Sequence, residues 1–180
     1  MSLDEKQIMS AAAAIRESYE TKSPIDALRK SYDMEIDDAY AVQEENTKYW
    51  LKQGRLLSGR KIGVTSHAVQ SQLGVNQPDF GMLFSDMAFA DGQEISMSHL
   101  LQPRIEGEIA FYLGKDLDSP GITLAEVLSA IEYAVAAIEV VDSRIAAWDI
   151  QITDTIADNA SSGLYAVSYT HLRAHETPCH

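Results

Sequence analysis

The most informative stretch of this sequence runs Arg104-Ile105-Glu106-Gly107-Glu108-Ile109-Ala110-Phe111-Tyr112-Leu113. Successive side chains of a β-strand point to opposite faces, so the alternation in this stretch predicts a strand with one apolar face. Ile105, Ile109 and Phe111 would share that face. Glu106 and Glu108 would lie together on the other, which gives the strand two carboxylates pointing the same way.

A second strand is predicted at Val135-Ala136-Ala137-Ile138-Glu139-Val140-Val141, which is apolar and rich in β-branched residues. The capping box Thr123-Leu124-Ala125-Glu126 predicts a helix before it, through about Tyr133. Glu139 is the one charged residue of the second strand. Because an ionised carboxylate in apolar surroundings costs several kcal/mol, we expect Glu139 to be paired, protonated or bound to a metal.

Apolar spacing upstream predicts helices over 3–21, 24–32 and 37–54, the first two with Ser2 and Ser23 as N-caps. From Gly59 the pattern changes to a strand at 59–64, a helical turn from Ser66 to Gly74 and a turn at 78–81. Helices followed by strands with an embedded helix predict an α+β fold, not an alternating doubly wound sheet.

The composition of the chain argues against several classes of function. The 180 residues carry 14 basic and 27 acidic side chains, a formal net charge of −13, which argues against a nucleic-acid partner. No apolar run approaches the roughly 20 residues that span a bilayer, and no basic and apolar leader is present, so we expect no membrane partner and a cytoplasmic location. Cys179 is the only cysteine, which excludes an intrachain disulfide.

The last residues differ in composition from the rest of the chain. His171, His175 and Cys179 recur every four residues and could place zinc ligands on one helical face. Residues 168–177, however, resemble the translation of a sequencing adapter, and we favour an artefactual tail over 168–180. We therefore expect a single domain over 1–167, with a helical part at 1–55 and the start of a β-rich core at 56–167.

Residues two apart on a strand lie about 7 Å apart on one face, where two carboxylates repel each other unless a cation lies between them. With Glu139 added, the three glutamates would form a carboxylate-only site, which favours Mg²⁺ or Mn²⁺. Two alternatives stay open. Glu106 and Glu108 could form a solvated face, and Glu139 could form a salt bridge to one of three cations, Arg144, Arg104 or Lys61.

Several ordered motifs resemble the hydratase/decarboxylase family of the fumarylacetoacetate hydrolase superfamily. They are Gly59-Arg60-Lys61-Ile62-Gly63-Val64-Thr65, Gln77-Pro78-Asp79-Phe80-Gly81, Gln102-Pro103-Arg104-Ile105-Glu106-Gly107-Glu108-Ile109-Ala110, Glu139-Val140-Val141-Asp142-Ser143-Arg144 and Asp154-Thr155-Ile156-Ala157-Asp158-Asn159-Ala160-Ser161-Ser162-Gly163.

The resemblance implies a mixed β-roll core of the fumarylacetoacetate-hydrolase type after the N-terminal helices, incomplete at the C-terminus because family chains run on beyond residue 167. It also implies a homo-oligomer and a divalent cation, Mg²⁺ or Mn²⁺, held by Glu106, Glu108 and Glu139. The implied activity is that of a lyase in aromatic-compound catabolism, which adds water to 2-hydroxypenta-2,4-dienoate (2-oxopent-4-enoate) to give 4-hydroxy-2-oxopentanoate. The shortened chain is expected to be poorly folded or inactive by itself.

The same resemblance suggests site residues. Lys61 would hold or protonate an oxyanion, and Asp79 would move a proton or activate water, although a surface lysine and a turn-forming aspartate are the plain alternatives. Ser161 and Arg104 would bind substrate. Three rival functions remain: a 4-oxalocrotonate decarboxylase or related dienoate hydratase, an acylpyruvate hydrolase, and an inactive fragment or assembly subunit.

Overall fold

A computed structural model describes residues 2–173 of the chain. Its strands are β1 (Leu57–Gly63), β2 (Asp79–Phe84), β3 (Ala88–Ala90), β4 (Pro103–Leu113), β5 (Ile131–Asp142) and β6 (Ser162–Arg173). Its α-helices are α1 (Glu5–Thr21), α2 (Ile36–Lys52), α3 (His67–Leu73), α4 (Leu124–Ala130) and α5 (Ile152–Ala157). Short helical turns are η1 (Leu28–Lys30), η2 (Ser85–Met87), η3 (Met97–His99), η4 (Ala146–Trp148) and η5 (Asn159–Ser161).

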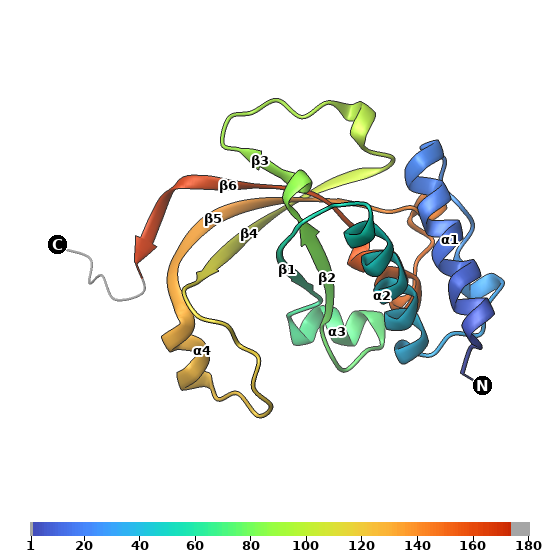
Figure 1. Cartoon of the computed structure of the whole chain (residues 1–180), viewed down its shortest axis with the longest axis horizontal. Helices are drawn as coiled ribbons and strands as arrows, with labels where there is room; N and C mark the ends of the chain where they lie inside the picture. Colours follow the sequence, from blue (N-terminus) through green and yellow to red (C-terminus); the bar gives the residue numbers. More distant parts are fainter. Residues whose placement is uncertain (1, 174–180) are drawn as a thin grey trace.

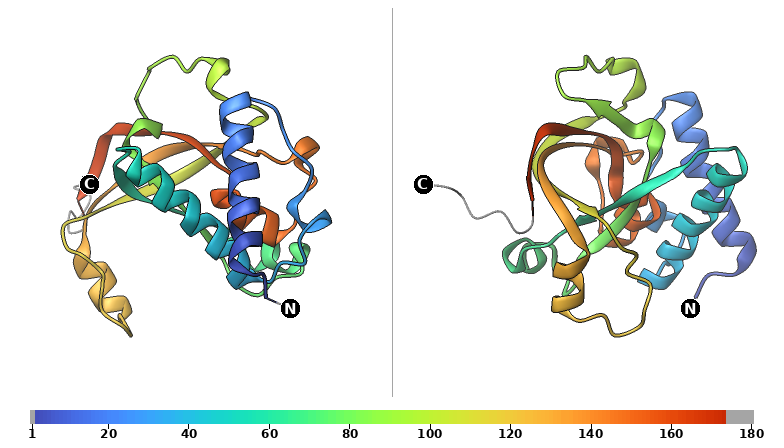
Figure 2. Two further views of the ribbon diagram at one scale, coloured as in Figure 1. Left: turned by 45° about the vertical axis from the view of Figure 1, so that its right-hand side comes forward. Right: turned by 60° about the vertical axis from the view of Figure 1, so that its left-hand side comes forward.

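The strands form two sheets. One has four strands in the order β3-β6-β5-β4, in which only the β3–β6 pair is parallel, and the other is the antiparallel pair β1–β2. Figure 1 shows α1 and α2 gathered at one end of the molecule and α4 at the opposite end, with β4, β5 and β6 running between them. Figure 2 shows how strongly these strands curve. The architecture is the predicted α+β fold, with mixed sheets after the N-terminal helices.

The N-terminal helices share a hydrophobic core with α5 and Ile145. Its buried residues come from α1, α2 and α5, from η1 and the residue before it, and from Ile145, which follows β5: Ala11, Ala12, Ile15, Ala27, Leu28, Ala39, Val42, Ile145, Ile156 and Ala157. Small alanine side chains at the helix contacts let the backbones approach closely. A single domain over 1–167 stays a prediction.

A second core cluster joins the end of α2 to the sheets. It consists of Trp50, Phe84, Met87, Val140 and Leu164. The rings of Trp50 and Phe84 meet edge to face with centroids 5.6 Å apart, a favoured aromatic geometry. Through this cluster the helices fix the position of β2 relative to β5 and β6.

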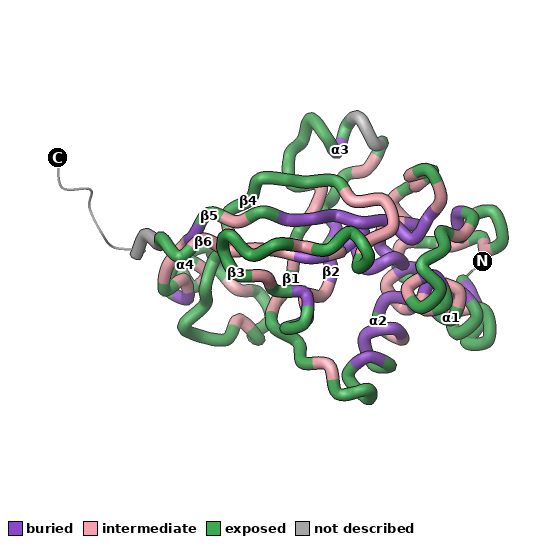
Figure 3. The backbone as a smooth tube through the Cα atoms, turned by 90° about the horizontal axis from the view of Figure 1, so that it is seen from above, coloured by how far each residue is buried: buried purple, intermediate pink, exposed green. Residues whose placement is uncertain are grey.

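The two broad faces of β4 are both open to solvent. Ile105, Ile109 and Phe111 on its apolar face are 74%, 65% and 57% exposed, and β4 lies at one edge of its sheet. Figure 3 shows the contrast with β5, which is buried along much of its second half while β4 beside it is exposed. Of the described helices, none is long and apolar enough to cross a membrane.

Four local predictions were wrong. The helix predicted through about Tyr133 ends at Ala130, because the residues from Ile131 onward belong to β5. The N-cap of α1 is Asp4, in a capping box with Gln7, because the Ser2 hydroxyl instead donates to Asp38. The predicted helix over 24–32 shrinks to η1, because Ile25 pairs as an isolated bridge with Ile145 and is extended there. The predicted turn at 78–81 is the start of β2, whose pairing with β1 begins at Asp79.

Strand β6 extends through Arg173, so residues 168–173 of the predicted tail continue the strand, and their backbone pairs with β5 near Tyr133. The remaining residues of that tail, His175 and Cys179 among them, lie outside the described part of the chain.

Candidate active site

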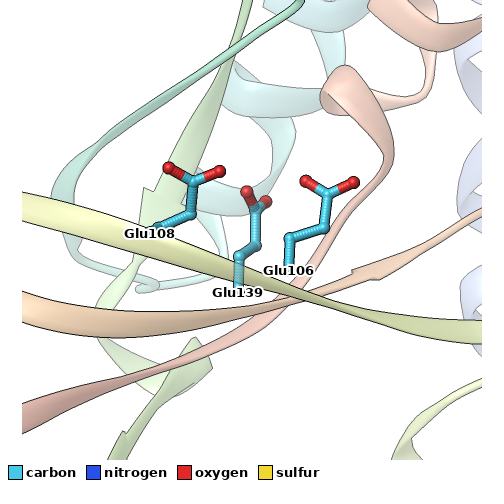
Figure 4. A group of neighbouring side chains, drawn as sticks. All are labelled: Glu106, Glu108 and Glu139. Atoms are coloured by element: carbon cyan, nitrogen blue, oxygen red, sulfur yellow. The ribbon is translucent and has the colours of Figure 1, made fainter.

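Strands β4 and β5 bring three glutamates together. In their antiparallel register Glu106 lies directly opposite Glu139, and Glu108 follows Glu106 on the same face. One carboxylate oxygen from each residue lies within 4.8 Å of those of the other two. Figure 4 shows the three side chains rising from the strands in the same direction. The pleat of two paired strands therefore suffices to make a three-carboxylate cluster.

The environments of the three glutamates differ. Glu106 and Glu108 are exposed, whereas Glu139 is only 7% exposed. Burial raises the pKa of Glu139, and the charges of Glu106 and Glu108 raise it further, while Lys61 opposes both. The Lys61 Nζ lies 3.2 Å from Glu139 Oε1, so Lys61 is the cation that pairs with Glu139. One ammonium faces three carboxylates, which leaves a local excess of negative charge suited to a further cation.

Asp79 lies beside Lys61. Strand β1 pairs with β2 so that Gly63 is opposite Asp79, and a Cβ added to Gly63 would lie 2.4 Å from Asp79 Oδ1 and 3.7 Å from Lys61 Nζ. Asp79 is 2% exposed, and neither carboxylate oxygen has a hydrogen-bond partner among the described residues. Burial raises the pKa of Asp79, and Lys61 partly opposes that shift. Such a carboxyl group is suited to carry a proton.

The turn η5 completes this side of the site. Asn159, Ala160 and Ser161 have φ values of +55°, +51° and +51°, a left-handed conformation that costs roughly 1–2 kcal/mol per residue. The Ala160 carbonyl accepts a hydrogen bond of 3.0 Å from Lys61 Nζ. The Ser161 hydroxyl is buried and has no partner among the described residues. Strain and an unsatisfied hydroxyl in one turn are features of functional sites.

Two contacts hold this turn against β2. Asn159 Nδ2 donates to the Met82 carbonyl at 2.9 Å, and the Met82 amide donates to Asn159 Oδ1 at 2.6 Å. The side-chain amide of Asn159 thus pairs with β2 as a strand backbone would. Gly81 permits the contact, because a Cβ there would lie 2.3 Å from the Asn159 carbonyl oxygen.

Arg104 lies at the start of β4, and the alternation of that strand puts it on the face that carries Glu106 and Glu108. Its guanidinium stacks over the Trp148 ring, 4.1 Å from the centroid, and the residue is exposed. No hydrogen bond or ion pair joins Arg104 to the glutamates within the described residues. Arg104 therefore lies apart from the contacts that join Lys61 to Glu139 and to the Ala160 carbonyl.

Sequence reasoning missed what holds the turn. Arg144 is fully buried, and its Nε donates to Asp158 Oδ1 at 2.5 Å. The sequence indicated Arg144 only as a possible partner of Glu139, and no local pattern pairs it with Asp158. The role of the Ala160 carbonyl could not be predicted either, because every residue has a backbone carbonyl and the sequence does not show which one meets Lys61.

Comparison with known proteins gives consistent relatives, although no protein-family model matches the chain. It is 61% identical over 139 residues to the TodF product hydratase of Pseudomonas putida, covering 77% of this chain and 52% of the relative. It is 50% identical over 166 residues to the 2-keto-4-pentenoate hydratase of Paraburkholderia xenovorans, covering 92% of this chain and 62% of the relative.

Solved structures of 4-oxalocrotonate decarboxylase from Pseudomonas putida are also similar, at 30% sequence identity. One, complexed with magnesium and adipate, superposes with a TM-score of 0.93 over 98% of this chain and 67% of its own. Another, complexed with calcium and acetate, gives a TM-score of 0.91.

The chain spans between half and two thirds of the length of the curated relatives it matches. Identity of this level along most of the chain, together with the shared fold, exceeds what a common architecture alone produces. The chain belongs to the hydratase/decarboxylase family that includes the 2-keto-4-pentenoate hydratases and 4-oxalocrotonate decarboxylase.

Proposed function

We propose that this chain carries the catalytic centre of a metal-dependent hydro-lyase that adds water to 2-hydroxypenta-2,4-dienoate and yields 4-hydroxy-2-oxopentanoate. The observation that carries the proposal is the convergence of Glu106, Glu108 and Glu139 beside Lys61. The names of the curated relatives, 2-keto-4-pentenoate hydratase and 2-hydroxypent-2,4-dienoate hydratase, support this substrate class.

The three glutamates fit a divalent cation, and we infer Mg²⁺ or Mn²⁺ because all of the donors are carboxylate oxygens. The complexes of the decarboxylase with magnesium and with calcium support a hard divalent ion. When bound, such an ion supplies Lewis acidity and a template for the carboxylate and the 2-oxygen of the substrate.

The reaction needs a proton at C5 of the dienol, which gives an enone, and then addition of water at C4. Lys61 is oriented by Glu139 and the Ala160 carbonyl, and its ammonium can stabilise negative charge that develops on the substrate oxygen. Asp79 is buried with a raised pKa, and in our proposal it transfers the proton or activates the water.

Substrate binding falls to two further residues in this proposal. The Ser161 hydroxyl is buried and unpartnered, so it is free to donate to a substrate oxygen. Arg104 lies at the exposed margin of the cluster and would attract the substrate carboxylate. Assembly into a homo-oligomer, a cytoplasmic location and an artefactual tail over 168–180 stay predictions.

A 4-oxalocrotonate decarboxylase is the second candidate, favoured by the TM-score of 0.93 to that enzyme. Its reaction would use the same site, with the 2-oxo group accepting electrons while a second carboxylate leaves as CO₂. Identities of 48–61% to the hydratases, against 30% to the decarboxylase, favour hydration.

The test is an assay of the purified chain, and of the full reading frame from which it comes, with Mg²⁺ and either substrate. Loss of the dienol absorbance with formation of 4-hydroxy-2-oxopentanoate would support hydration, whereas CO₂ release from 4-oxalocrotonate would support the second candidate. Glu106→Gln should abolish turnover and weaken Mn²⁺ binding, and Glu94→Gln, a change at an exposed glutamate outside the cluster, should do neither. If the full-length protein binds no divalent ion and turns over neither substrate, a non-catalytic role replaces the proposal.

A further inference from the structure

We propose that Arg144 is a positioning residue of this site, which holds the left-handed turn η5 at both ends and so places the Ala160 carbonyl and the Ser161 hydroxyl. The inference rests on the proposed function for its catalytic consequence. Its structural part, the anchoring of the turn, can be tested without any turnover.

The contacts of the Arg144 guanidinium bracket the turn. Nη2 donates to the Asp158 carbonyl and Nη1 to the Ser162 carbonyl, each at 3.0 Å, so the residues just before and just after η5 are held by one side chain. Nε donates to the Asp158 carboxylate at 2.5 Å, and that carboxylate also accepts the Arg144 backbone amide at 2.9 Å. A planar guanidinium has donors on several sides, which such a grip requires.

The cation is fully enclosed. Arg144 and Asp158 are both 0% exposed, and the guanidinium lies 4.3 Å from the centre of the Tyr19 ring. The Tyr19 hydroxyl lies 3.5 Å from the same Ser162 carbonyl that Arg144 binds. A buried ion pair often contributes no more to stability than apolar side chains of similar volume would. We therefore infer that Arg144 and Asp158 matter here because they fix the geometry of the turn.

That geometry is one the backbone resists. Three consecutive non-glycine residues in η5 have positive φ, and such conformations persist only where surrounding contacts over-determine them. Arg144 supplies contacts at both ends, and the Asn159 amide supplies those to β2. Without the guanidinium the turn is free to relax, which moves the Ala160 carbonyl away from Lys61 Nζ.

The strand positions of the three glutamates do not come from this turn, and the one described link between cluster and turn is Lys61, which contacts both Glu139 and the Ala160 carbonyl. Glu106, Glu108 and Glu139 are placed by the β4–β5 pairing, and none of them is hydrogen-bonded to η5. Loss of the Arg144 grip is therefore expected to alter the turn and catalysis while metal binding persists. A variant that merely destabilised the whole fold would instead weaken metal binding together with catalysis.

The test compares Arg144→Lys with Arg29→Lys. Arg29 also pairs with an acid that is fully buried, Asp154, and ties η1 to α5 without contacting the turn. A lysine at either position keeps the charge but has its donors at one point, so at 144 it cannot span the Asp158 and Ser162 carbonyls while also binding the Asp158 carboxylate. The control thus reports the cost of weakening a buried pair elsewhere.

The first readout is hydrogen exchange, followed by mass spectrometry of the peptide that spans 158–163. The Ser161 amide donates to the Asp158 carbonyl, which is one of the acceptors of Arg144, so its exchange should be faster in Arg144→Lys than in Arg29→Lys. Mn²⁺ affinity, measured by calorimetry, should equal that of the wild type in both variants. In the active full-length enzyme, Arg144→Lys should lower kcat by about 10²-fold with KM little changed.

Equal exchange over 158–163 in the two variants would overturn the proposal, as would a kcat for Arg144→Lys equal to that of Arg29→Lys. If the wild type does not hydrate the dienoate, the proposed function fails, and the exchange comparison still decides whether Arg144 anchors the turn. If Arg144→Lys does not fold, Asp158→Asn takes its place. This variant loosens the guanidinium from the other side, and unchanged exchange in it would count against the proposal.

Discussion

Replacing Gly81 with alanine tests how closely β2 must approach the turn η5. A Cβ at position 81 would lie 2.3 Å from the Asn159 carbonyl oxygen, 2.9 Å from its carbonyl carbon and 2.9 Å from Ser162 Oγ. Two of these three atoms belong to the backbone, so no side-chain rotation relieves the contact. Either β2 or the turn must move.

The cost follows from the size of that movement. Ordinary contacts of a Cβ begin near 3.4 Å, so the strand and the turn must separate by about 1 Å in an interior that is otherwise closely packed. Overpacking of this kind costs about 1–3 kcal/mol, and a backbone obstacle that is itself fixed on several sides puts Gly81→Ala near 3 kcal/mol. The separation also breaks the bonds between Asn159 and Met82, which join the turn to β2.

Urea unfolding followed by circular dichroism measures this cost, with Gly59→Ala as the matched control. Gly59 lies in the partner strand β1 and has no heavy atom within 4 Å of its added Cβ. Since alanine loses less backbone entropy than glycine in a strand, Gly59→Ala should be neutral or more stable by about 0.5–1 kcal/mol. If the two variants are equally stable, the close approach of β2 to η5 does not exist in solution.

Three further predictions concern the site and the core. In metal-free buffer Glu139→Gln should gain stability relative to wild type as the pH rises from about 4 to about 7. The sign follows because burial raises the pKa of Glu139 above its ordinary value of 4.5, so the unfolded chain releases this proton at lower pH than the folded chain does. Denaturant titration measures the free energy of unfolding of both proteins, and a difference between them that stays constant across that pH range would contradict the prediction. Added Mn²⁺ should raise the Tm of the wild type but not that of Glu108→Gln, as scanning calorimetry would show. Trp50→Ala should cost about 3–5 kcal/mol in urea unfolding, because the Trp50 ring meets Phe84 within the second core cluster and Tyr19 beside it. A loss below about 1 kcal/mol would show that the helices are not fixed to the sheets through this cluster.

The strands that carry the glutamates could be predicted from sequence because their signals are local and periodic. The alternation from Arg104 to Leu113 gives β4 almost to the residue, and the β-branched run around Glu139 gives the second half of β5. The helices α3 and α4 begin at the serine and threonine caps that predicted them, Ser66 and Thr123. Each of these signals lies within a few residues of the structure that it specifies.

The failures arose where distant contacts override local preference. Pro78-Asp79-Phe80-Gly81 has the composition of a turn, but pairing with β1 makes Asp79 a strand residue and buries its carboxylate. Ser23-Pro24 has the form of a helix start, yet the bridge from Ile25 to Ile145 spans most of the chain and holds that segment extended. No local pattern contains the partner in either case.

The candidate site likewise has a part that local sequence patterns indicate and a part that depends on distant contacts. Two strand patterns place Glu106 and Glu108 on one face and Glu139 in the next strand, and the resemblance to the family added their assignment as metal ligands. The partners of Lys61 depend on the position of η5, which Arg144 and Asn159 fix by contacts that a single sequence does not reveal.

The opposed positions of Glu106 and Glu139 also bear on how the chain folds. A slip of one residue in the β4–β5 register would turn Glu106 and Glu108 to the other face and bring Ile105 and Ile109 in their place, since side chains alternate along a strand. In the native register the carboxylates repel, and the single ammonium of Lys61 offsets only part of that repulsion, so the remaining charge favours the slipped arrangement until a divalent cation is present. A divalent ion available during folding would therefore act as a selector of strand alignment, and chains folded without it would spend longer in misaligned pairings.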